Sequence, residues 1–132
     1  MEDGKVMINI IYEDNHLLVV EKPINILVQG DHTQDLDLLT VLKEDLKKRY
    51  HKPGNVYLGL VHRLDRPVGG IMVFAKTSKA ASRLSDQVRT HKLDKQYHAI
   101  VYGKVKEKDQ LHDYLLKDPK TNMVIVDQRG KE

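Results

Sequence analysis

The chain has 132 residues, of which 40% are hydrophobic and 31% are charged, a composition typical of one modest globular domain. Its apolar runs are far shorter than the ~20 residues of a membrane-spanning helix, and its polar N-terminus has no signal-peptide core, so we expect a cytoplasmic protein without a membrane partner. The absence of cysteine excludes disulfides and thiolate metal sites, and a net charge of +3 is too small to indicate nucleic-acid binding by itself.

The first part of the chain predicts two strands followed by a helix. Residues 6–12 and 17–20 have strand character, and Pro23 ends the second strand. From Asp37 the apolar period becomes helical, with basic residues in the last turn, and the Pro-Gly pair at 53–54 ends this element. The residues of its apolar face are Leu39, Leu42, Leu46 and Tyr50.

The second part of the chain predicts further strands around a second helix. This helix is expected from about Ser78, with Thr77 or Ser78 as its N-cap. Several strands joined by short turns, together with two helices, predict an α+β fold with a mixed, mainly antiparallel sheet, in which residues 1–132 form a single domain. The helix residues expected to face inward are Ala81, Leu84 and Val88, and the strands expected after it cover residues 97–105, 111–116 and 123–127.

The most informative stretch is the turn between the apolar runs at 57–61 and 71–75. Asp65 lies in this turn, between Arg63 and Arg66. An aspartate between two strands is ordinarily a solvated turn residue. Because guanidinium groups are always charged and bind carboxylates or phosphates, the flanking arginines favour a functional turn.

Three segments of the chain, in the same order, resemble the RluA-type RNA pseudouridine synthases. The His-Arg-Leu-Asp sequence at 62–65, followed by two glycines at 69–70, resembles the catalytic motif of that family. Residues 12–23 resemble its N-terminal motif, and residues 95–103 resemble its Lys-x-Tyr-x-Ala-x-Val-x-Gly motif. The resemblance implies a pseudouridine synthase-like fold that isomerises uridine to pseudouridine in structured RNA, ribosomal or transfer RNA, with no metal and no organic cofactor.

The same resemblance implies roles for individual residues. Asp65 matches the essential carboxylate, which acts on the ribose as a nucleophile at C1′ or as a base at C2′, and both routes stay open. Tyr97 matches the tyrosine that packs on the target base and takes the C5 proton, and a half-buried core tyrosine is the alternative. Arg63 matches the arginine that replaces the flipped uridine in the RNA stack, and a phosphate clamp or an ion pair with Asp65 is the alternative.

Further candidates for contact with the RNA are His62, Arg66 and Lys95. His62 follows the family pattern of a positioning or RNA-contacting residue beside the arginine. The histidines at 62, 91 and 98 lack the close spacing of metal ligands on one helix, so no metal site is expected.

The sequence departs from the family pattern in two places. The loop at 67–70, Pro-Val-Gly-Gly, replaces the Asp-Thr-Ser-Gly type of sequence common in the family, which we interpret as a subfamily variant. Residues 104–132 contain no match to the later family motif Thr-Gly-Arg-x-His-Gln-Ile-Arg, whose first arginine pairs with the catalytic carboxylate. We therefore expect an incomplete catalytic domain, roughly its N-terminal half, in which Asp65 is misplaced, solvated, or paired with Arg63 or Arg66.

These departures keep other functions open beside a pseudouridine synthase. The chain is then an inactive truncation, or an RNA-binding module without catalytic activity, which the basic residues between Arg83 and Lys108 support. A glycosidase is disfavoured because Asp65 has no second acid in a comparable motif.

Overall fold

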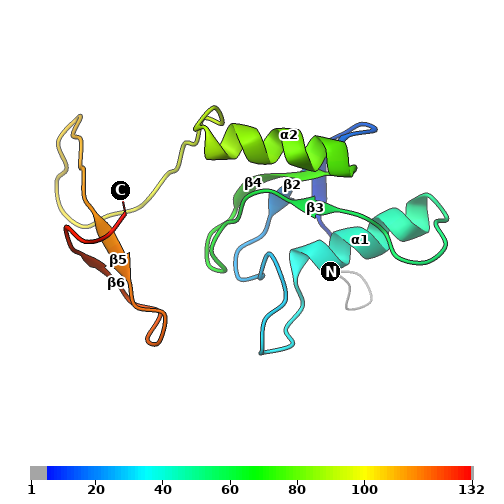
Figure 1. The fold of residues 1–132 in the computed structure, drawn as a ribbon, viewed down its shortest axis with the longest axis horizontal. Helices are drawn as coiled ribbons and strands as arrows, with labels where there is room; N and C mark the ends of the chain where they lie inside the picture. Colours follow the sequence, from blue (N-terminus) through cyan, green and yellow to red (C-terminus); the bar gives the residue numbers. More distant parts are fainter. Residues whose placement is uncertain (1–5, 132) are drawn as a thin grey trace. The chain divides into compact units, whose positions relative to one another are not determined.

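The computed structural model describes residues 6–131, which divide into two compact units with the boundary in the sequence after Lys95. The N-terminal unit, up to Lys95, holds the larger sheet and the helices, and the C-terminal unit, from Gln96, holds a short hairpin (Figure 1). The single domain expected from the sequence stays a prediction. Within the described residues no helix has the length and apolar character needed to cross a membrane.

A four-stranded antiparallel sheet forms the centre of the N-terminal unit. Its strands are β1 (Asn9–Glu13), β2 (Leu17–Lys22), β4 (Gly70–Ala75) and β3 (Gly59–Leu60), in the order β1-β2-β4-β3. The Asp14 carboxylate accepts backbone N–H groups across the β1–β2 turn, which fixes that hairpin locally. The two strands predicted at the N-terminus are confirmed: the first begins three residues later and ends one residue later than predicted, and the second ends two residues later.

One face of this sheet carries the hydrophobic core beneath α1 (Leu38–Arg49). The register places Leu18 opposite Phe74 and Val20 opposite Met72, and all four side chains are fully buried. The helix begins where predicted, because the Asp37 carboxylate accepts the N–H of Thr40 at 3.0 Å. Tyr50, expected on the apolar face, instead lies half exposed at the helix end; the residues that α1 buries are Leu38, Leu42 and Leu46.

The other helix, α2 (Ser78–Arg89), lies across the opposite face of the sheet, so that the sheet is sandwiched between two helices (Figure 1). Thr77 is its N-cap, as predicted, and accepts the N–H of Ala80 at 3.1 Å. A Cβ on Gly59 would lie 3.0 Å from the Cβ of Ala81, so this glycine lets helix and sheet approach closely. Ala80 is the residue of α2 that is buried, whereas the residues predicted to face inward are half-buried, namely Ala81, Leu84 and Val88.

The C-terminal unit contains a hairpin of β5 (Leu115–Lys117) and β6 (Val124–Val126), which confirms in shorter form the two strands predicted there. The strand predicted over residues 97–105 is wrong, because the structure shows no regular secondary structure in that segment. Ile100 and Tyr102 are fully exposed, and no described segment pairs with this stretch. The alternating pattern is present, but a strand also needs a second backbone to bond its N–H and C=O groups. The α+β class, with antiparallel sheets and two helices in the described residues, is confirmed.

Candidate active site

The sequence motif around Asp65 forms a tight turn between β3 and β4. The N–H of Val68 donates to the carbonyl oxygen of Asp65 at 2.9 Å, which closes the turn. The backbone of Arg66, inside the turn, is fixed from the other side, because its carbonyl accepts the N–H of Asn25 at 2.8 Å. The turn therefore has a defined backbone although its side chains lie at the surface.

Lys22 is the buried anchor of this turn. Its side chain is among the largest fully buried ones, with 1% of its surface exposed. The ammonium donates to the carbonyl oxygens of Pro23 at 3.0 Å, Arg66 at 3.0 Å and Val68 at 2.7 Å, which uses all three of its donors. Burial lowers the pKa of Lys22, and the negative charge of Asp65 opposes that shift, so the carboxylate lies within electrostatic reach of the ammonium.

Two glycines at the end of the turn allow it to pack closely on the segment after β2. A Cβ on Gly69 would lie 3.2 Å from both the carbonyl oxygen of Lys22 and the Cγ2 of Ile24. Gly70 has a φ of 151°, which side-chain-bearing residues rarely adopt. Gly69 therefore favours the close approach of the turn to Lys22, and Gly70 favours the backbone conformation that leads into β4.

The carboxylate of Asp65 is exposed, and no side chain in residues 6–131 is hydrogen-bonded to it. Arg63 and Arg66 are turned to other partners. Arg63 Nη2 donates to Oε1 of Gln29 at 2.5 Å, and Arg66 Nη1 lies 2.8 Å from Oδ2 of Asp35. Of the arrangements that the sequence left open, the structure shows the solvated carboxylate and not the ion pair with a neighbouring arginine.

Both arginines are thus hydrogen-bonded to residues 29–35, which we call the acidic loop, and both remain exposed. Hydrogen bonds from the hydroxyl and the N–H of Thr33 lower the pKa of Asp31, and the charge of Arg66 adds to this effect. Arg66 therefore lies in the field of two carboxylates, those of Asp31 and Asp35. These partners were not predicted from the sequence, in which the one signal for them is the presence of two aspartates, at 31 and 35, in the loop before α1.

His62 and Lys95 both belong to the N-terminal unit, and the charge of Lys95 acts on the imidazole of His62. The N–H of Val73 in β4 donates to Nε2 of His62 at 3.0 Å, so the imidazole replaces a backbone partner beyond the short β3. Burial lowers the pKa of His62, and the positive charge of Lys95 lowers it further. Both effects favour the neutral imidazole, which is the form that accepts this hydrogen bond.

Tyr97, the remaining predicted site residue, lies in the C-terminal unit and is 64% exposed. Its role at the site stays a prediction, as do the RNA contacts assigned to the other residues. In the part of the chain that the structure describes, no group of three histidine or acidic side chains is placed to hold a metal ion.

Comparisons with known proteins agree with the motif and the fold. The sequence profile described as "RNA pseudouridylate synthase" matches residues 16–132. Ribosomal large subunit pseudouridine synthase C of Buchnera aphidicola (subsp. Acyrthosiphon pisum) is 33% identical over 92% of this chain and 38% of its own length. The tRNA pseudouridine synthase C of Haemophilus ducreyi is 34% identical over 83% of this chain and 43% of its own length. The chain thus spans well under half the length of these relatives.

A solved structure shows the same likeness in three dimensions. Human RNA pseudouridylate synthase domain containing 4 superimposes with a TM-score of 0.55 and is 30% identical, over 64% of this chain and 30% of the human one.

Proposed function

The chain belongs to the RNA pseudouridylate synthase family, and we propose that it supplies the catalytic aspartate, Asp65, with which the protein isomerises uridine to pseudouridine in structured RNA. The observation that carries this proposal is the geometry of the turn. Asp65 is presented to solvent on a backbone that a buried ammonium fixes from beneath through Arg66 and Val68. A carboxylate in such a place is free to meet a substrate while its position is restricted.

The reaction needs one side chain of the enzyme that acts on the ribose of the target nucleotide. In the reaction the C1′–N1 bond breaks, the uracil turns, C5 bonds to C1′, the proton on C5 is released, and N1 takes up a proton. A carboxylate serves as nucleophile at C1′ or as base at C2′, so Asp65 suits either route. The phenol of Tyr97 is our candidate for stacking on the base and accepting the C5 proton.

The arginines of the motif are the candidates for holding the RNA. Arg63 and Arg66 are exposed, and their present partners are an amide and a carboxylate of the acidic loop. A guanidinium stacks on bases and binds phosphates, so bound RNA would replace these acidic-loop partners of the two arginines. His62 and Lys95 complete the set of proposed RNA contacts.

The relatives named above act on ribosomal and on transfer RNA, and we propose one of these two classes as the substrate. In either class of RNA, the features that the protein would recognise are the phosphate backbone and a base turned out of the stack.

Release of tritium from RNA that carries [5-³H]uridine tests the proposal. We expect Asp65→Asn to abolish the release, because an amide is neither a nucleophile nor a base here. The matched control is Asp86→Asn, which removes an exposed carboxylate from α2 with the same change of charge and is expected to retain activity. Activity retained by Asp65→Asn, with folding equal to that of the parent, would overturn the assignment.

A second function, an RNA-binding module without catalysis, is supported by one observation. The turn fixes the backbone at Asp65, but no side chain in the described residues is hydrogen-bonded to the carboxylate to orient it for catalysis. Binding of RNA without any tritium release by the parent protein would favour this second function.

A further inference from the structure

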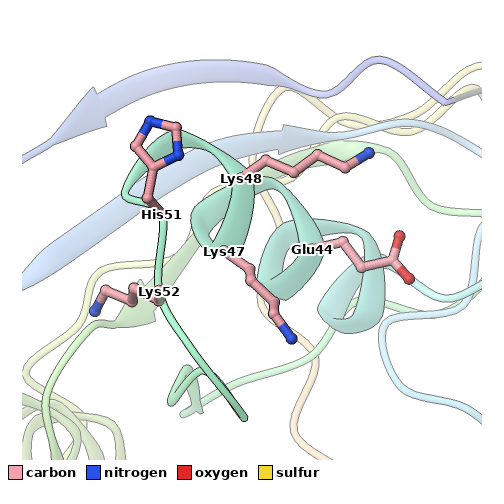
Figure 2. Close-up of a pocket in the computed structure, with 5 residues that line it drawn as sticks. All are labelled: Glu44, Lys47, Lys48, His51 and Lys52. Carbon is pink, nitrogen blue, oxygen red and sulfur yellow. The ribbon is translucent and has the colours of Figure 1, made fainter.

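The C-terminal end of α1 carries a cluster of cations that the proposed active site does not use. Lys47, Lys48, His51 and Lys52, here called the basic cluster, line an open cavity of 720 Å³ together with Glu44 (Figure 2). The cluster belongs wholly to the N-terminal unit.

The helix end itself brings these residues together. The N–H of Lys52 donates to the carbonyl oxygen of Lys47 at 3.1 Å, and the N–H of Tyr50 donates to that of Leu46 at 3.1 Å. These bonds fold the chain back over the last turn, with His51 at a φ of 49°. Lys52, although it lies beyond the helix, is therefore held beside Lys47.

The arginine in this last turn forms ion pairs within the protein, whereas the lysines do not pair with any carboxylate of the described residues. Arg49 is paired at 2.7 Å with Glu13 and at 2.7 Å with Asp45. Within residues 6–131, no carboxylate lies within ion-pair distance of Lys47, Lys48 or Lys52. Cations near a helix C-terminus stabilise the helix by ~0.3–1 kcal/mol each, which explains a lysine inside α1 but not one after it.

The directions of the side chains indicate the shape of the ligand. In Figure 2 the ammonium groups of Lys47, Lys48 and Lys52 point away from one another and do not converge on one point. A single small anion would be reached by one of them at a time. An extended polyanion, with phosphates spaced along its chain, can contact all three.

The place of the cluster separates it from the reacting nucleotide. Figure 1 shows the C-terminal end of α1 on the far side of the N-terminal unit from the turn before β4 that carries Asp65. A phosphate bound at the cluster therefore belongs to a part of the RNA that flanks the target uridine.

We propose that the basic cluster is a second RNA-binding surface, which contacts the phosphate backbone away from the target nucleotide. This inference rests on the proposed function. The surface reads no bases and increases the affinity for long or folded RNA, while the chemical step at Asp65 does not depend on it.

The test is the triple variant Lys47→Gln, Lys48→Gln, Lys52→Gln, assayed in single turnover over a range of RNA and salt concentrations. We expect the RNA concentration for half-maximal rate to rise at least ~tenfold at low salt, and the slope of log affinity against log salt to become shallower by about two, since each phosphate contact contributes ~0.7–0.9. The rate at saturating RNA is expected to stay unchanged. The single variant Lys52→Gln, outside the helix, is expected to give about one third of the change in slope.

The matched control is Lys117→Gln, Lys120→Gln, Lys131→Gln, which makes the same change of net charge in the C-terminal unit. The inference would be overturned if the control variant lost as much RNA affinity as the cluster variant, or if the cluster variant kept the parent's RNA concentration for half-maximal rate. Tritium release by the parent protein would still support the proposed function in either case. Lost binding to phosphatidylserine vesicles with unaltered RNA kinetics would assign the cluster to a membrane instead. A parent protein that neither binds nor modifies RNA overturns both proposals.

Discussion

At the scale of single residues, the most deeply buried charge in the described chain supports the exposed carboxylate of Asp65. Burying an ammonium group costs several kcal/mol unless its donors are satisfied. Lys22 satisfies them with three carbonyls, two of which belong to the turn that follows Asp65. The backbone position of Asp65 is therefore a consequence of the hydrogen bonds that the buried Lys22 ammonium makes to backbone carbonyls.

The acidic loop sets a competition for the motif arginines. The ion pair between Arg66 and Asp35 is exposed on both sides, with 43% and 48% of the side-chain surfaces accessible. Exposed pairs contribute ~0.2–1 kcal/mol, so under the proposed function displacement of Asp35 by RNA would have a small but measurable cost.

Removing this competitor should strengthen RNA binding. For Asp35→Asn we expect an RNA affinity up to about fivefold higher at low salt, with the gain shrinking as salt screens the charges. Asp127→Asn, which removes the carboxylate partner of Arg129 in the C-terminal unit, is the control and should leave the affinity unchanged. Filter binding or fluorescence anisotropy with the same RNA measures both variants. Equal affinity of Asp35→Asn and parent would mean that the Arg66–Asp35 pair does not compete with RNA.

At the scale of elements, Glu13 joins three parts of the N-terminal unit. It lies at the end of β1 and accepts Lys76 after β4 at 2.7 Å, Arg49 of α1 at 2.7 Å and the hydroxyl of Tyr50 at 2.6 Å. Burial by itself raises the pKa of Glu13, but these hydrogen bonds together outweigh it and lower the pKa to about 2.

This shift predicts a pH-dependent contribution to stability. Because the folded pKa is below the ordinary value of 4.5, the ionised carboxylate stabilises the fold above pH 4.5, and the contribution is lost as the pH falls toward 2. We expect Glu13→Gln to lower the free energy of unfolding by about 2 kcal/mol at pH 7, and by much less at pH 3. Urea unfolding of both proteins at the two pH values measures this. A difference that does not change with pH would contradict the assigned role.

The elements show which features of the fold could be predicted from the sequence. Both helices were predicted with their starts, because a cap such as Asp37 or Thr77 bonds within three residues of itself. The strand expected over 97–105 was wrong, because pairing depends on a distant backbone that the local pattern does not contain.

The same distinction applies to the candidate site. The turn and its aspartate were found from the motif alone. The contacts that position this turn could not be predicted from the motif, because they join residues far apart in the sequence. Lys22 and Val68 are 46 positions apart, and Arg66 and Asp35 are 31 positions apart. Residue types and spacing do not encode which of several acidic or carbonyl groups a long side chain reaches across such separations.

At the scale of the whole molecule, the modest net charge of +3 conceals two separate sets of cations in the N-terminal unit. The motif arginines are paired with the acidic loop, and the basic cluster at the end of α1 has no carboxylate partner among the described residues. Together they present positive charge on two sides of the unit, as expected for a protein that holds a folded RNA at more than one place.

The central claim is that the protein isomerises uridine within RNA by means of Asp65. The most direct measurement is to incubate substrate RNA with the protein, digest it to nucleosides and quantify them by chromatography. We predict that pseudouridine appears in an amount equal to the uridine lost, with no free uracil, and that Asp65→Asn produces none. Free uracil in place of pseudouridine, or pseudouridine formed equally well by Asp65→Asn, would contradict the account.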